Sequence, residues 1–475
     1  MNERSLWRAV LPGPCTLLLT AFVATALHAQ APAPPDSLAP RVDSIARSVL
    51  AATGVPSATV AVVRHGRLVY AQAYGQARLD PAVAATPAMR YALGSISKQF
   101  TAAALLLLQE EGKLSIDDPV EKWVPGLTRG GEVTLRMVLS HTSGYQDFWP
   151  QDYVMPGMTR PTTPAAILAR WARQPLDFEP GTRWQYSNTN YTIAALAVEK
   201  ASGMPFFRFV QTRILDPLGL TSAIDLDARG AGAIEPAGYM RYALGPLRPA
   251  IPTGEGWTWG AGELAMTPGD LAKWDIAMIT RSLLSPASWR ALQTGTLLRN
   301  GAATNYGLGV SVWTDGTHHY VEHGGEVAGF TAQNLVLPED SAAVVVLTNQ
   351  DAAPAAESIA QQIVRSLFGG QDALAGDRTA LARRIFEGLL GGTVDRSLFT
   401  ANANAYFSEQ ALHDFASSLS PLGSVASFEQ TAHWLRGGMT GRSYRVAMSG
   451  GRALRVWTYE TADGTLEQYQ VAPTD

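Results

Sequence analysis

Strand-forming sequence lies at both ends of one long stretch of the chain, and helix-forming sequence fills its middle. Residues 57–75 read SATVAVVRHGRLVYAQAYG, two β-rich runs separated by His65-Gly66, which is typical of a hairpin. The region from about 115 to 300 is instead rich in helical segments and Gly/Pro loops. Further β-rich runs follow at 306–313, 318–325, 331–338 and 342–349. This order predicts an α/β domain whose antiparallel sheet is built from both ends of the stretch, is flanked by helices and has a helical region inserted between its halves.

Three helical segments are predicted around this sheet. Residues 37–53 and 355–368 have helical patterns, and the second of them ends at Gly369-Gly370, a plausible domain boundary. The run FTAAALLLLQEEGKL, which begins at Phe100, is apolar on most faces of a helix. It therefore predicts a buried core helix, and it is too short to span a membrane.

The region 371–475 has a different pattern and predicts a small accessory α+β domain. Two helical runs are expected near 378–390 and 400–419, and three strands within 441–471. This order suggests a cystatin- or NTF2-like module. Its aromatic side chains are expected in the core rather than in a ligand site. They are Trp434, Tyr444, Trp457, Tyr459 and Tyr469.

The N-terminus has the features of a secretory signal peptide over residues 1–29. Arg4 and Arg8 precede the apolar run Thr16–Leu27, and small residues follow. A membrane anchor is the alternative, but the run is shorter than the ~20 residues that span a bilayer. A Pro/Ala linker over 30–36 comes next. The chain is therefore predicted to be a bacterial protein, periplasmic or secreted, with no stable membrane span after cleavage.

Composition excludes several other classes of protein. The single cysteine, Cys15, lies inside the predicted signal peptide, so the mature chain is expected to have no disulfide and no cysteine-based metal site. The formal net charge is −4 over 475 residues, with no long block of like charge, which argues against nucleic-acid binding. No cofactor is predicted.

One lysine occupies a chemically informative place. The chain has five lysines among its 37 basic residues, and Lys98 follows Ser95 by three positions in YALGSISKQF. On a helix this spacing places both side chains on one face. A serine hydroxyl is a poor nucleophile until a base takes its proton, and a buried lysine can be that base, whereas arginine stays protonated. The pair is weak evidence by itself, because such spacings also arise by chance.

Two further elements extend this pattern. Tyr186 and Asn188 form a Tyr-x-Asn after a turn, where a phenol could accept or relay a proton and an amide could bind a substrate amide. His323, Gly324 and Gly325 end a predicted strand, and glycines let a strand edge approach a ligand closely. A backbone N–H there, with that of Ser95, could stabilise an oxyanion. Taken alone, each element is more often structural.

In this combination and order, the elements resemble the serine β-lactamase and penicillin-recognising family. They are similar in particular to its class C β-lactamase-related branch, which includes D-aminopeptidases, DD-carboxypeptidases and some esterases. The resemblance covers roughly residues 37 to 368, within a predicted hydrolase domain of 37–370, and further family-like stretches are LSHTSG at 139–144, 178–203 and 260–271. It implies a β-lactamase/transpeptidase-like fold.

The resemblance also implies residue roles. Ser95 would be the acylated nucleophile and Lys98 would activate it. Tyr186 would act as a general base or protonate the leaving group, paired with Lys98. Asn188 would hold the substrate amide. The backbone N–H groups of Ser95 and Glu326, which follows Gly325, would form the oxyanion hole.

His323 departs from the family pattern. It stands where many relatives carry the lysine of a Lys-Thr-Gly, which binds the carboxylate of β-lactams, and it is shorter and able to be neutral. Gly324 also replaces a hydroxyl-bearing residue. Both changes argue against an efficient β-lactamase and favour D-amino peptides, amides or esters as substrates.

The sequence therefore predicts an exported serine hydrolase that forms an acyl-enzyme through Ser95. Its substrates would be D-amino-acid-containing peptides, including fragments of peptidoglycan, or small esters. A class C-like β-lactamase is the alternative, and a catalytically inactive penicillin-recognising sensor is a third. A Ser-His-Asp hydrolase using His141 is disfavoured because no Gly-x-Ser-x-Gly is present. A metal site is also disfavoured, because His319 and His323 would lie ~13 Å apart on a strand and His318 would point away from both.

Overall fold

The computed structural model describes residues 38–151, 153–314, 318–368 and 374–474. The predicted signal peptide (1–29) and linker (30–36) lie outside this part of the chain. Within it, no helix is both long and apolar enough to cross a membrane.

Both ends of the long stretch contribute to one antiparallel sheet, as the sequence predicts. Among the described residues this central sheet has seven strands in the order β3-β2-β1-β12-β11-β10-β9. At its centre, β1 pairs with β12, so that Val60 lies opposite Val346. The strands are β1 (Ser57–Arg64), β2 (Arg67–Leu79), β3 (Ala82–Ala84), β9 (Ser311–Thr314), β10 (His319–Val327), β11 (Phe330–Leu337) and β12 (Ala342–Thr348).

The turn signals in the sequence explain the strand boundaries. His65 and Gly66 both have positive φ, 51° and 67°, as a two-residue hairpin turn between β1 and β2 requires. The run 306–313 is strand only from Ser311, because Gly309 has a φ of 77° and breaks the extended backbone before it.

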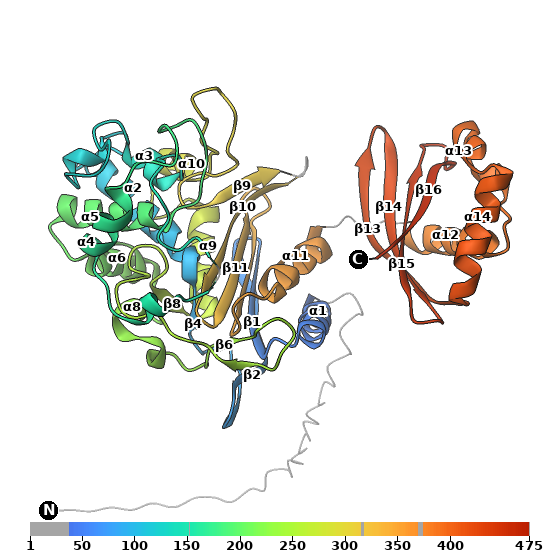
Figure 1. The fold of residues 1–475 in the computed structure, drawn as a ribbon, viewed down its shortest axis with the longest axis horizontal. Coiled ribbons are helices and arrows are strands. Elements are labelled where there is room, and N and C mark those ends of the chain that lie inside the picture. The colour runs from blue at the N-terminus through green and yellow to red at the C-terminus, as the bar shows by residue number, and fades with distance from the viewer. Residues whose placement is uncertain (1–37, 152, 315–317, 369–373, 475) are drawn as a thin grey trace, which may run out of the picture.

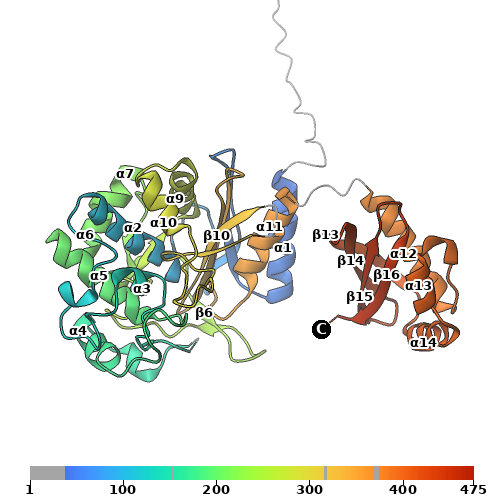
Figure 2. The ribbon, with the colours of Figure 1, turned by 90° about the horizontal axis from the view of Figure 1, so that it is seen from above.

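Helices cover both faces of the central sheet (Figure 1). On one face α1 (Leu38–Thr53) packs beside α11 (Ala355–Phe368), and both enclose a core with the apolar side chains of β1 and β12. Figure 2 shows these two helices together on the same side of the sheet. On the other face lie α2 (Ser97–Glu110) and α9 (Pro268–Thr280). Every residue of β12 is buried, which is expected for a strand covered on both faces.

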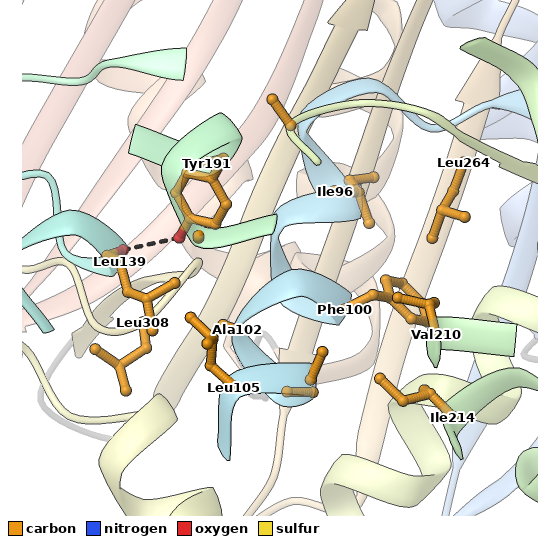
Figure 3. Close-up of a cluster of buried hydrophobic side chains, with 14 of the residues drawn as sticks. Ile96, Phe100, Ala102, Leu105, Leu139, Tyr191, Val210, Ile214, Leu264 and Leu308 are labelled. Atoms are coloured by element: carbon orange, nitrogen blue, oxygen red, sulfur yellow. Dashed lines mark hydrogen bonds between the residues drawn. The ribbon is translucent and has the colours of Figure 1, made fainter. Parts of the chain in front are cut away.

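Helix α2 lies in the middle of the larger core. All of its residues from Ser97 to Leu108 are buried. Figure 3 shows Phe100 and Leu105 among apolar side chains from other elements, including Val210, Ile214 and Leu308. Burying each such side chain stabilises the fold by roughly 1.5–3 kcal/mol. The start of α2 is therefore firmly held, and Ser95 lies directly before it.

The inserted helical region consists of short elements. Its helices are α3 (Leu135–Leu139), α4 (Pro164–Ile167), α5 (Asn188–Ser202), α6 (Phe206–Val210), α7 (Asp216–Leu218), α8 (Leu226–Arg229), α9 and α10 (Pro286–Leu292). The short strands outside the central sheet are β4 (Tyr91–Ala92), β5 (Ile224–Asp225), β6 (Tyr239–Met240), β7 (Arg248–Pro249) and β8 (Leu264–Met266).

The C-terminal region forms its own sheet and core. Its helices are α12 (Ala375–Leu390), α13 (Ala401–Tyr406) and α14 (Glu409–Leu419), and its strands, in sheet order, are β13 (Val425–Arg436), β14 (Met439–Met448), β15 (Ala453–Glu460) and β16 (Leu466–Pro473). The sequence predicted the last three strands and missed β13. Register shifts at Val425/Ser427 and Gln430/Ala432 interrupt the alternation of side chains that would have indicated β13.

The predicted burial of the C-terminal aromatics is right for two residues and wrong for three. Tyr444 and Tyr469 are each 1% exposed and belong to the core beneath the helices. Trp434, Trp457 and Tyr459 are partly exposed and lie outside that core. The reason is the two-residue period of a strand: Trp457 pairs with Ser443, and so points to the opposite face from Tyr444.

Candidate active site

Ser95 lies on a short 3₁₀ helix, η1 (Gly94–Ile96), between β4 and α2. Strand β4 is fixed by its pairing with β8, and Leu93 N–H donates to Leu264 O at 2.9 Å. Ser97, the other serine of this segment, is buried and accepts a hydrogen bond from Leu264 N–H at 3.1 Å. Ser97 thus has a structural contact, and Ser95 alone faces the cavity described below.

Two glycines allow β10 to lie directly against the Ser95 turn. A Cβ on Gly325 would fall 1.8 Å from Leu93 O, and a Cβ on Gly94 would fall 2.6 Å from the backbone N of Glu326. Gly94 also has a φ of 52°. These contacts explain why the His-Gly-Gly sequence is needed here: a side chain at Gly325 would separate the strand from the serine.

Lys98 is completely buried and makes three hydrogen bonds through Nζ. Its partners are Ser95 Oγ at 2.9 Å, Asn188 Oδ1 at 2.8 Å and the backbone O of Ala261 at 2.8 Å. None of the three is a charged group. Burial lowers the pKa of Lys98 to about 7, although the negative charges of Asp147 and Glu263 oppose the shift.

These three partners fix the direction of the Lys98 lone pair when the amine is neutral. A neutral amine has two hydrogens and one lone pair. Asn188 Oδ1 and Ala261 O can only accept, so they take the two hydrogens. Ser95 Oγ is the one partner with a proton to donate, and it therefore faces the lone pair. This is the geometry of a general base beside its nucleophile.

Tyr186 hydrogen-bonds with the side chain of Ser95, and its ring centroid lies 5.0 Å from Lys98 Nζ. Burial raises the pKa of Tyr186 above its ordinary value, and the charge of Asp147 adds to the effect. The resting side chain is thus a neutral phenol. Of the two roles predicted for Tyr186, this favours relaying a proton to the leaving group over acting as the resting base.

The segment His141–Asp147 fixes the backbone around Tyr186. The N–H of Gln185 donates to His141 O at 3.0 Å, and the N–H of Ser187 donates to His141 Nδ1 at 3.2 Å. The His141 ring also packs against Tyr186 in a tilted arrangement, with ring centroids 4.3 Å apart. His141 is fully buried and its Nδ1 is directed at Ser187 and Asn190, so it supports Tyr186 rather than completing a Ser-His-Asp triad.

Asn188 is held between Lys98 and a carboxylate. Its Oδ1 accepts from Lys98, while its backbone N–H and its Nδ2 donate to Asp147 Oδ1 at 2.8 and 3.2 Å. The oxygen and the nitrogen of the Asn188 amide thus both have protein partners. A substrate amide could still accept a hydrogen bond from the Nδ2 hydrogen that Asp147 does not use. Sequence reasoning missed Asp147, which no motif singled out and which lies 41 positions before Asn188.

His323 lies in the cavity wall on β10 and is only 7% exposed. Its Nε2 is 2.8 Å from Tyr306 Oη, and its Nδ1 is 2.5 Å from Gly324 O. Burial lowers the pKa of His323 to about 4, and the neighbouring Lys98 contributes to the shift. Gly324 O can only accept, so Nδ1 carries the proton and Nε2 accepts from Tyr306. The ring is a neutral group at neutral pH, unlike a lysine at the same position.

The backbone of Glu326 lies beside the Ser95 turn, whereas its side chain makes a hydrogen bond elsewhere. The contact of its backbone N with Gly94 places this amide beside the Ser95 turn, as an oxyanion hole requires. Its side-chain Oε1 accepts from Ala352 N–H at 2.8 Å.

A cavity of about 820 Å³ opens over Ser95. Four carboxylates line it, and no lysine or arginine is among its described lining residues. The acidic residues are Asp147, Glu326, Asp351 and Glu357. Aromatic side chains form much of the remaining wall, and they include Phe148, Trp149, Tyr153, Trp184 and Trp257. The cavity is thus negative and aromatic, a property that the sequence motifs did not reveal.

His318 and His319, which are close to His323 in the sequence, do not line this cavity and instead contact acidic side chains. His318 Nδ1 is 2.8 Å from Asp340 Oδ2, and His319 Nδ1 is 3.4 Å from Glu339 Oε2. Within the described ranges, no group of three or more His, Cys, Asp or Glu side chains is arranged to hold a metal ion.

Comparison with known proteins agrees with this fold. Residues 42–367 match the family model described as Beta-lactamase. The chain is 28% identical over 293 residues to the "Putative penicillin-binding protein PbpX" of Bacillus subtilis (strain 168), covering 62% of this chain and 70% of that protein.

Two solved structures are also similar. The D-stereospecific amidohydrolase from Streptomyces sp. is 28% identical, with a TM-score of 0.59 over 70% of this chain and 99% of that one. The octameric penicillin-binding protein homologue from Pyrococcus abyssi is 23% identical, with a TM-score of 0.62 over 91% of this chain and 99% of that one. The second likeness shows the fold alone.

The class defined by these matches is the β-lactamase/transpeptidase-like serine hydrolases. The chain belongs to the β-lactamase family in the broad sense, which includes a penicillin-binding protein and a D-stereospecific amidohydrolase among its relatives.

Proposed function

We propose that this protein is an exported hydrolase that forms an acyl-enzyme through Ser95 and acts on D-amino-acid-containing amides and peptides or on small esters. The observation that carries the proposal is the environment of Lys98. A buried amine whose lone pair faces Ser95 Oγ, and whose pKa is near neutrality, is a base suited to activating that serine.

Acylation follows from this arrangement. Ser95 Oγ attacks the substrate carbonyl carbon while its proton moves to Lys98 Nζ. The carbonyl oxygen becomes an oxyanion that accepts from the backbone N–H groups of Ser95 and Glu326. The bond to the leaving amine or alcohol then breaks, and the leaving group takes a proton from Tyr186. The protonated Lys98 then gives a proton back to Tyr186. Deacylation repeats the sequence with water as the nucleophile.

The charge of the cavity favours substrates with a free amine over substrates with a free carboxylate. Four carboxylates line the cavity, and His323 is neutral there. A β-lactam carboxylate would find no cation among the described lining residues, whereas a protonated α-amine would be attracted. The aromatic wall suits an apolar side chain next to that amine. A D-aminoacyl amide combines these features, and the similarity to a D-stereospecific amidohydrolase supports the same substrate class.

β-Lactamase activity is the alternative, favoured by the similarity to a penicillin-binding protein. A parallel assay separates the two functions. We expect the wild type to cleave D-alanyl p-nitroanilide and p-nitrophenyl esters with a higher kcat/KM than nitrocefin, and to prefer the D-alanyl substrate over its L-alanyl counterpart. Ser95→Ala should abolish every activity. Nitrocefin as the best substrate would overturn the proposal in favour of a β-lactamase.

A binding protein without turnover is the third function, and covalent labelling tests it. A fluorophosphonate should label wild-type Ser95 and leave Ser95→Ala unlabelled. Equal absence of labelling in the two proteins, with both folded, would favour a sensor.

Export and the accessory region belong to the same proposal. Residues 1–29 are the proposed signal peptide, which N-terminal sequencing of the mature protein tests; an intact Met1 would contradict it. Residues 371–475 are the proposed accessory domain, of cystatin- or NTF2-like type, following the hydrolase domain at 37–370. If that domain covers the cavity, deletion of 375–475 should change ester turnover, whereas unchanged kinetics would show that it does not.

A further inference from the structure

We propose that Asp147 is a positioning residue that determines which end of the Asn188 amide faces Lys98, and thereby directs the Lys98 lone pair at Ser95. This inference rests on the proposed acyl-enzyme function. It concerns a carboxylate that no sequence motif identifies and that touches neither Ser95 nor Lys98 in a hydrogen bond.

The position of Asp147 is fixed by two backbone N–H groups. Its Oδ1 accepts from the N–H of Asn188, the first residue of α5, at 2.8 Å and from the N–H of Trp149 at 3.1 Å. The same carboxylate receives Asn188 Nδ2 at 3.2 Å on Oδ1 and 3.4 Å on Oδ2. Burial raises the pKa of this carboxyl, and these donors and the charge of Lys98 oppose the rise. Every one of the contacts supplies a donor to Asp147, so the side chain functions as an ionised acceptor.

This arrangement leaves one orientation for the Asn188 amide. With Nδ2 toward Asp147, Oδ1 faces Lys98 and accepts from it at 2.8 Å. In the opposite orientation Oδ1 would face the carboxylate, placing two acceptors together without a hydrogen between them, which costs free energy. Asp147 therefore excludes the rotated amide.

The rotated amide would disable the base. Its Nδ2 would then face Lys98 and could only donate, so it would take the lone pair of the neutral amine. Ser95 Oγ–H would lose its acceptor, and Lys98 would point one of its own hydrogens at Ser95 instead. A single rotation of Asn188 thus converts a base that accepts from the nucleophile into one that donates to it.

The test measures Lys98 and Ser95 separately. The chain has five lysines, so ¹³Cε-lysine labelling resolves the titration of Lys98 by NMR. The groups that face Lys98 are Ser95, Asp147, Tyr186, Asn188, Tyr191 and Glu263, with His141 and His323 nearby. Ser95 is measured by the rate of labelling with a fluorophosphonate, in which an O–P bond forms, fluoride leaves and the serine proton passes to Lys98.

Asp147→Asn should lower the Lys98 pKa, because a negative charge is lost and the amide is free to rotate. The decisive readout is the labelling rate at high pH, where Lys98 is neutral in both proteins. We expect that plateau to fall about 10- to 100-fold, part of what a general base contributes. If only the charge mattered, the plateau would equal that of the wild type, and this result would overturn the inference.

A side-chain exchange provides the rescue. In Asn188→Asp two carboxylates face each other, so labelling should fall at least as far as in Asp147→Asn. In the double variant Asp147→Asn/Asn188→Asp, the amide introduced at position 147 can donate to the carboxylate introduced at position 188, whose other oxygen accepts from Lys98. The lone pair then faces Ser95 again, and the double variant should label faster than either single variant. A double variant no faster than the slower single one would contradict the proposal.

The chain offers a matched control in a second buried pair. Asn334 Nδ2 donates to Asp275 at 2.7 Å, and neither residue lines the cavity. Asp275→Asn changes a carboxyl–amide pair away from the cavity, so it should leave the labelling plateau within about twofold. Failure of the proposed function has a different signature: wild-type Ser95 would not label, whereas the Lys98 titration would still move in Asp147→Asn.

Discussion

The Ser95 cavity and the C-terminal sheet each bury one basic side chain, but they treat it differently. Lys98 is completely buried, and its three hydrogen-bond partners are uncharged. Arg442 is 3% exposed and forms a buried ion pair with Glu460, which Arg378 also contacts through an Nε hydrogen bond of 2.9 Å. Among the described residues Lys98 thus has no carboxylate within hydrogen-bond distance, whereas Arg442 shares the carboxylate of Glu460 with Arg378.

The difference shows how burial produces reactivity at one site and structure at the other. Burial without a contacting carboxylate lowers the pKa of Lys98 to about 7, because only the charged form is penalised. A guanidinium cannot lose its proton in a protein, so Arg442 requires Glu460 in order to be buried at all. The same solvent exclusion therefore yields a base in one place and an ion pair in the other.

Exchanging the basic residue at Lys98 should have the largest effect. Lys98→Arg places a permanent cation beside Ser95, so no base remains, and we expect kcat/KM for p-nitrophenyl esters to fall at least about 10³-fold. Lys122→Arg is the control, since Lys122 is exposed and pairs with Asp118. Full activity of Lys98→Arg on every substrate would refute the Ser–Lys mechanism.

Removing the charge partner of Arg442 should have the next largest effect, on stability rather than on chemistry. Glu460→Ala leaves two arginines near a buried site without their carboxylate, which should cost about 3–5 kcal/mol in the unfolding of the C-terminal region. Urea denaturation followed by tryptophan fluorescence measures it. The exposed pair Arg383–Glu387 is the control, and Glu387→Ala should cost less than about 1 kcal/mol. Equal costs would mean that burial of the pair is unimportant.

The pH dependence of turnover should be smaller and graded. Lys98 must be neutral to accept the Ser95 proton, and its pKa is about 7. Below that pH the neutral fraction, and with it kcat/KM, should fall about tenfold for each pH unit. His323 titrates near a pKa of about 4 and adds no second limb in this range. An activity that is flat from about pH 5 to 8 would show that Lys98 is not the base.

The sequence predicted some features of the Ser95 site and missed others. Ser95 and Lys98 share a helix turn, so their proximity follows from spacing alone, and the sheet built from both ends followed from the positions of the β-rich runs. Asp147 could not be found in this way. Its place depends on the 141–147 segment folding back onto residues 185–188 through backbone contacts. The stretch LSHTSG, which resembles the family, is the available signal for that segment.

The C-terminal sheet shows the same limit. Arg442 and Glu460 lie on the neighbouring strands β14 and β15. The pairing of β15 with β16 shifts register at Tyr459/Glu460, and the pairing of β13 with β14 contains two more register shifts. An alternating pattern identifies a regular strand, but each bulge moves the following side chains to the other face. Alternation also does not tell which face of a sheet the helices cover, so the partly exposed positions of Trp434, Trp457 and Tyr459 did not follow from the sequence.

Adding a third buried cation should have the smallest effect and sharpens the comparison most. His323 is a neutral ring in the cavity wall, so His323→Lys would place an ammonium where the cavity's described lining has no basic side chain. Attraction of a substrate carboxylate should raise kcat/KM for nitrocefin by about 2- to 10-fold and lower it for D-alanyl p-nitroanilide by a similar factor, since rim and cavity charges change binding modestly. The neutral variant His323→Gln is the control and should give no gain with nitrocefin. If His323→Lys leaves the ratio of the two activities unchanged, cavity charge does not select the substrate. If the ratio changes as expected, a cation at position 323 selects the substrate by its charge. Lys98 would then act in proton transfer and Arg442 in stability, so that each of the three buried basic groups has a different role.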